Sequence, residues 1–164
     1  MPRPDPDLVV TISILDRLTD LNPKTTADPP SNRSQSVHQL KVSLRRDLEW
    51  LLNTRRNPDE APESYPELSR SLYNYGLPDV TSMALNSPRD RQHLMREIER
   101  TIEIFEPRLE GARVRPAPED NAGAGPRILR FQIEALLKMD PAPEQILFDT
   151  VLQLNTGEYQ VKGD

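Results

Sequence analysis

The stretch IEIFEPRLEGARV, Ile102 to Val114, contains the point at which the periodicity of the chain changes. Before it, apolar residues recur every three or four positions, which is typical of a helix. After it, they alternate with polar residues, which is typical of a strand. Pro107 ends the helix because its ring clashes with the carbonyl group four residues earlier. The sequence therefore predicts an α+β fold, with N-terminal helices packed on a C-terminal antiparallel sheet.

Three helices are predicted. A short one covers residues 13–20, where Ser13 is the N-cap. The clearest covers 36–56, with Arg55 and Arg56 in its last turn, where positive charge suits the carbonyl end of the helix dipole.

The third helix is predicted to begin after the N-cap residue Ser87, with Pro88 at its first position. Its buried face is expected to contain Leu94, Ile98, Ile102, Phe105 and Leu109. Short strands are then predicted at 112–116, 128–139 and 146–154, followed by a hairpin into a final strand that ends near Lys162.

The composition limits the size of the core. Hydrophobic residues make up 35% of the 164 residues and charged residues 29%, and 17 residues are proline. This balance allows one small core but not a deep substrate cleft as well. Residues 1–33 are predicted to form a flexible N-terminal arm, and 34–162 a single domain in which 116–127 is a loop.

The charge and the residues that are missing exclude several classes of partner. The net charge is −5, with 26 acidic and 21 basic residues, so general nucleic-acid binding is not expected. No apolar run approaches the ~20 residues of a membrane helix, and no secretory signal begins the chain. The chain contains no cysteine. We expect a cytoplasmic protein without membrane insertion.

No catalytic, cofactor-binding or metal-binding residue is predicted. His38 and His93 lie on the two long predicted helices, and neither has a second ligand at a suitable spacing. The sequence contains no nucleophile elbow and no glycine-rich phosphate loop. Glu106 is a candidate half-buried carboxylate, but a solvated acid is favoured. The arginine pairs at 45–46 and 55–56 are interpreted as part of solvated helix faces.

Two interpretations fit Glu106, Pro107 and Arg108. In one, the proline ends a helix beside a surface ion pair that contributes little energy. In the other, the rigid corner holds both charged side chains outward as a preorganised docking site.

The order of five segments resembles the TssE family, baseplate subunits of bacterial type VI secretion systems. This family is similar to the "lysozyme-like" baseplate wedge proteins of contractile-tailed phages. The resemblance covers about Ser13 to Val161 and lies in SILDRLTD, SVHQLKVSLRRDLEWLLNTRR, SLYNYGLPD, IEIFEPRLEGARV and LRFQIEALLKMDPAPEQILFDTVLQLNTGEYQV.

The resemblance implies a structural protein that is not an enzyme. Such proteins dock on the wedge subunits TssF and TssG, adjoin other baseplate subunits such as TssK, and meet the contractile TssB–TssC sheath. The family's Glu-Pro-Arg motif matches Glu106, Pro107 and Arg108, which implies that these residues bind a partner.

On this view, loss of the Arg108 side chain should weaken docking and leave the fold intact. We further expect the final segment EYQVK to be a sheet edge that pairs with sheath strands. The alternative function is that of a peptidoglycan-cleaving, lysozyme-like hydrolase.

Overall fold

The computed structural model describes residues 13–19, 33–59, 61–62, 64–80, 87–117, 128–140 and 142–163. Most of the predicted arm over 1–33, and most of the predicted loop over 116–127, lies outside these residues. The elements in chain order are α1 (Ile14–Leu18), α2 (Arg33–Asn53), the 3-10 helices η1 (Pro66–Arg70) and η2 (Leu72–Asn74), α3 (Pro88–Phe105), β1 (Leu109–Pro116), β2 (Ile128–Leu137), β3 (Glu144–Gln153) and β4 (Glu158–Gly163).

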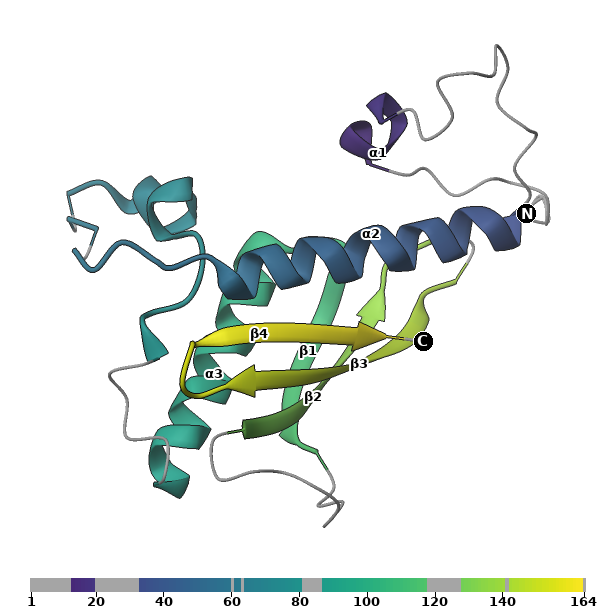
Figure 1. The fold of residues 1–164 in the computed structure, drawn as a ribbon. Helices are drawn as coiled ribbons and strands as arrows, with labels where there is room; N and C mark the ends of the chain where they lie inside the picture. The colour runs from purple at the N-terminus through teal and green to yellow at the C-terminus, as the bar shows by residue number, and fades with distance from the viewer. Residues whose placement is uncertain are drawn as a thin grey trace.

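The four strands form one antiparallel sheet in the order β1-β2-β3-β4. Each strand therefore pairs with its neighbour in the sequence, as in a meander. Figure 1 shows α2 passing alongside β4, and α3 lying against β1. The predicted α+β fold, with helices first and an antiparallel sheet afterwards, is confirmed.

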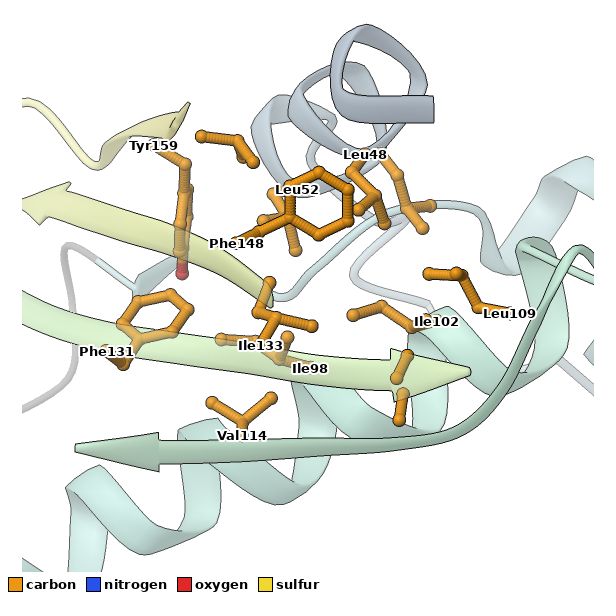
Figure 2. Packing of buried hydrophobic residues seen from close by; sticks show 14 of the residues in the cluster. Leu48, Leu52, Ile98, Ile102, Leu109, Val114, Phe131, Ile133, Phe148 and Tyr159 are labelled. Carbon is orange, nitrogen blue, oxygen red and sulfur yellow. The ribbon is translucent and has the colours of Figure 1, made fainter. Parts of the chain in front are cut away.

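Strand β2 shows why this part of the chain forms a sheet. Every second side chain from position 131 onward is buried: Phe131, Ile133, Ala135 and Leu137. That period of two directs one set of residues into the core and the other toward solvent. Figure 2 shows Leu48 of α2 and Ile98 of α3 in the same cluster of buried side chains, so the core lies between the sheet and the two long helices.

Helix α3 begins as predicted and ends slightly earlier than its apolar pattern suggested. The Ser87 side chain accepts a hydrogen bond from the first turn, and Pro88 occupies the first helical position. The buried residues Leu94, Ile98 and Ile102 share one face. The assignment of Leu109 to this helix was wrong, because that residue begins β1 and is buried there in the same core.

Helix α2 ends at Asn53, so the prediction that Arg55 and Arg56 lie in its last turn was wrong. A contact distant in sequence turns the chain away from the helix. The Thr54 carbonyl accepts a hydrogen bond from the Leu77 N–H at 2.9 Å, and the Leu77 carbonyl accepts one from the Arg56 N–H at 2.8 Å. These two bonds replace the helical pairing that would otherwise continue.

The buried Tyr159 carries a hydroxyl group that the core does not satisfy. Its side chain packs edge to face with Phe131, with ring centroids 6.3 Å apart, and the residue is only 2% exposed. Among the described residues, its hydroxyl oxygen has no hydrogen-bond partner. Burial alone raises the pKa of Tyr159. The phenol is therefore buried without compensation for its lost hydration.

We expect Tyr159→Phe to leave the free energy of unfolding unchanged, or to raise it by up to about 2 kcal/mol, because only an unsatisfied polar atom is removed. Urea denaturation followed by circular dichroism measures this change. Tyr65→Phe, at an exposed tyrosine, is the matched control and should have no effect. A loss of more than about 1 kcal/mol in Tyr159→Phe would show that the hydroxyl is bonded, for example to a buried water.

Candidate functional site

The Glu-Pro-Arg motif forms the corner between α3 and β1. The Glu106 N–H bonds to the Ile102 carbonyl at 2.8 Å and closes the last turn of the helix. The Leu109 N–H then bonds to the Glu106 carbonyl at 3.0 Å, where β1 begins. Pro107 lies between these bonds, is exposed, and needs no N–H partner. The corner is thus held by main-chain bonds on both sides of the proline.

Glu106 points inward rather than outward. The residue is 5% exposed, and its carboxylate accepts three hydrogen bonds from Arg108. Two come from the guanidinium, at 2.6 Å from Nε and 2.5 Å from Nη2, and one comes from the backbone N–H at 3.3 Å. The paired side-chain bonds form the bidentate geometry that is strongest for arginine and carboxylate. The expectation that both charged side chains project from the corner was wrong for Glu106.

A second carboxylate, Asp47 of α2, also binds Arg108. The Arg108 Nη2 donates to Asp47 Oδ2 at 2.7 Å, across 61 residues of sequence. The Arg108 side chain retains 26% exposure. Because Asp47 lies on α2 and Arg108 follows α3, this ion pair ties the corner to the other long helix.

The ion pairing continues from Asp47 to the N-terminal helix. Arg46 donates two hydrogen bonds to Asp47 Oδ1, at 3.1 and 2.9 Å, and a third to Asp16 Oδ1 at 2.9 Å. Asp16 lies in α1, whose predicted N-cap Ser13 accepts the Asp16 N–H at 3.1 Å. We call the five residues the charge chain: Asp16, Arg46, Asp47, Arg108 and Glu106.

The pKa shifts along the charge chain follow from these bonds. The hydrogen bond to Glu106 raises the pKa of Arg108, burial opposes this, and the bond to Asp47 raises it further. Burial alone would raise the pKa of Asp16, but its bonds from Ser13 and Arg46 outweigh burial and lower the pKa. The raised pKa means that the Arg108 guanidinium stays cationic beside Glu106 and Asp47.

Arg46 also adjoins an exposed aromatic residue. Its guanidinium carbon lies 4.9 Å from the centre of the Trp50 ring, and Trp50, the only tryptophan of the chain, is 54% exposed. Tryptophan and arginine are enriched at the centres of protein interfaces. We call Arg46, Trp50, Pro107 and Arg108 the corner surface.

Sequence reasoning identified the motif but missed Asp47 and Trp50. Asp47 sits in an ordinary run of charged residues on α2, so nothing local links it to the corner. Trp50 offered one usable signal, namely a large aromatic residue placed off the apolar stripe of its helix.

The other residues considered from the sequence are not gathered into a site. His38 and His93 are exposed on different helices, and no group of three potential ligands within the described part of the chain is placed to hold a metal. Arg55 pairs with Asp79, and Arg56 pairs with Glu97. Arg55 and Arg56 are therefore each paired with a carboxylate and do not form a free basic face.

Among the described residues, Glu106 is not placed like the acid of the carboxylate pair that glycosidic cleavage uses. The acid of such a pair carries a proton into an open cleft, whereas Glu106 faces Arg108. A hollow of about 180 Å³ lies at the C-terminal end of α2, between Asn53, Leu77 and Tyr159. Ligand clefts commonly span about 300–1,000 Å³. None of the described helices is long and apolar enough to cross a membrane.

Comparison with known proteins places the chain in a family. No curated protein sequence matches it. A solved chain from "The baseplate complex from the type VI secretion system" is similar to it, with 19% identity and a TM-score of 0.46, over 71% of this chain and 96% of that chain. The family model described as baseplate wedge protein gp25 matches residues 38–142. Because this match spans more than half of the chain, the protein belongs to the family of baseplate wedge protein gp25, as its sequence resemblance indicated.

Proposed function

We propose that this protein is a TssE-type structural adaptor of the bacterial type VI secretion baseplate. In this proposal it docks on TssF and TssG, lies near other baseplate subunits such as TssK, and connects the baseplate to the TssB–TssC sheath. It acts at the cytoplasmic side of the inner membrane and has no catalytic activity. The family match over 38–142 carries the proposal, since it includes most of α2, all of α3 and the motif.

The corner surface is the proposed contact with TssF and TssG. Glu106 serves it indirectly, because the buried carboxylate holds the guanidinium of Arg108 in one orientation. Pro107 and Trp50 are exposed beside this fixed charge network. Side chains that are already ordered lose little conformational entropy on binding, which favours the docked state.

The proposed sheath contact uses main-chain pairing at a sheet edge. The final segment forms β4, which is an edge strand as expected. The side chain of Asn53 already binds the main chain of Tyr159 on this edge, so a sheath strand that pairs there has to displace it.

Co-expression with TssF and TssG, followed by size exclusion, tests the wedge contact. Trp50→Ala should fold normally and lower retention in the complex by about tenfold or more, as expected for an interface anchor. Tyr65→Ala, at another exposed aromatic, is the matched control and should leave retention unchanged.

A second variant separates binding by the motif from its role in the fold. Glu106→Gln with Arg108→Met removes both charges and keeps similar volumes, which proteins commonly tolerate. We expect this double variant to fold and to be lost from the TssF–TssG complex. If both it and Trp50→Ala assembled like the wild type, the corner surface would not be the docking site.

A further inference from the structure

The solvent face of α3 carries a row of basic side chains. Its members are exposed and recur at spacings of four, three and four residues: Arg89, His93, Arg96 and Arg100. With 3.6 residues per turn, this spacing keeps them within an arc of about 60° around the helix. That arc lies opposite Ile98, which is fully buried in the core. We call these four residues the basic stripe.

The acidic residues nearest the basic stripe are engaged by other parts of the fold. Glu97 pairs with Arg56 at 3.2 Å, and Glu99 accepts a backbone N–H of β1 at 2.8 Å. Glu97 precedes Arg100 by three residues and Glu99 follows Arg96 by three, a spacing at which opposite charges pair on a helix. The fold directs both carboxylates away from these partners. Of the ion pairs among the described residues, none includes an arginine of the basic stripe.

The basic stripe also opposes the energetics of its own helix. Arg89 lies in the first turn, where the positive end of the helix dipole disfavours a cation. The last turn, where a cation would be favoured, contains no basic residue. Arg96 and Arg100 are like charges one turn apart, which destabilises a helix. A negatively charged partner along the basic stripe would relieve both effects.

The surroundings of the basic stripe favour carboxylates over other anions. An amphipathic helix binds a membrane by inserting its apolar face, whereas the apolar face of α3 is buried in the core. The net charge of −5 and the exposed Glu103 beside the basic stripe disfavour nucleic acid. Arginine binds a carboxylate through two parallel hydrogen bonds, which suits an acidic protein surface.

The length and spacing of the basic stripe match a second helix. Arg89 and Arg100 are eleven residues apart, which corresponds to about 16 Å along the axis. A helix lying alongside α3, with acidic residues at spacings of four, three and four, can place a carboxylate opposite each arginine.

We propose that the basic stripe of α3 docks an acidic helix of another protein, one whose glutamates or aspartates recur every three or four residues. This site is separate from the corner surface, whose residues belong to α2 and to the segment that follows α3. Salt screens exposed charge pairs, so the complex should weaken as ionic strength rises.

Fluorescence anisotropy with a synthetic helical peptide tests the proposal. The labelled peptide carries glutamates at spacings of four, three and four on one face, and a control peptide has the same composition with its glutamates spread around the helix. We expect a Kd below about 1 mM at low ionic strength, and at least tenfold weaker binding by Arg89→Glu with Arg96→Glu. Arg70→Glu with Arg130→Glu makes the same charge change at exposed arginines elsewhere and should bind like the wild type.

Thermal unfolding shows whether the stripe variant remains folded. Arg89→Glu with Arg96→Glu should raise Tm by about 2–4 °C, because a glutamate suits the first turn and one at position 96 pairs with Arg100.

Three results would overturn the proposal. They are no binding by the wild type, equal binding of the control peptide, or tighter binding to phosphatidylglycerol vesicles or double-stranded DNA than to the acidic peptide. None of these measurements involves TssF or TssG, so failure here leaves the proposed wedge contact unaffected.

Discussion

Replacing Arg108 with alanine lowers the free energy of unfolding by about 3–5 kcal/mol. The substitution leaves the Glu106 carboxylate buried at 5% exposure, and among the described residues only the backbone N–H of residue 108 remains to bond it. It also removes the ion pair with Asp47 that ties the corner to α2. An unpaired charge away from water is among the most costly defects in a folded protein.

Chemical denaturation of Arg108→Ala measures this loss, and two variants identify its cause. Arg108→Lys keeps the positive charge but not the planar guanidinium, so its free energy of unfolding should lie between those of the wild type and Arg108→Ala. The uncharged pair Glu106→Gln with Arg108→Met should recover most of the stability, because no charge remains buried. A loss below about 1 kcal/mol in Arg108→Ala would contradict a structural role for the pair. The sequence alone predicted that loss of the Arg108 side chain leaves the fold intact. The buried ion pair in the structure instead predicts a destabilised protein.

The second large effect is expected for Gly76→Ala, which should lower the free energy of unfolding by more than about 4 kcal/mol. Gly76 has φ of +98°, and a Cβ atom there would lie 2.2 Å from the Thr54 carbonyl oxygen. That oxygen accepts the Leu77 N–H, so it cannot move away without breaking the bond that ends α2. Strain and a backbone clash therefore act together.

Gly111→Ala is the matched control for this prediction. Gly111 also has positive φ, at +64°, but a Cβ atom there would meet nothing within 4 Å. Conformational strain alone should cost about 1–2 kcal/mol. Denaturation of both variants separates strain from steric overlap. Equal losses at the two positions would show that the close approach to Thr54 is relieved by a small shift of the chain.

In the corner between α3 and β1, the sequence predicted the break in the chain but not the burial of Glu106. Pro107 predicted a break between helix and strand, and the break lies there. Both interpretations of the motif placed Glu106 and Arg108 at the surface, because two charged residues beside a proline resemble an exposed turn. Burial of Glu106 depends on a guanidinium folded back over it and on Asp47 from another helix. No local pattern encodes that arrangement.

Local sequence patterns were enough to predict the order of helices and strands, the start of α3 at its serine cap, and the alternation of β2. These features depend on side-chain spacing and on residues within one turn of each other, so a linear pattern contains them. Such patterns could not predict where α2 ends, which charges pair, or how the outer edge of β4 is closed. Those outcomes depend on contacts such as Asp47 with Arg108 and Asn53 with Tyr159, which lie 61 and 106 residues apart. Packing of the whole chain brings these groups together, and the energy of each contact exists only after that packing has formed.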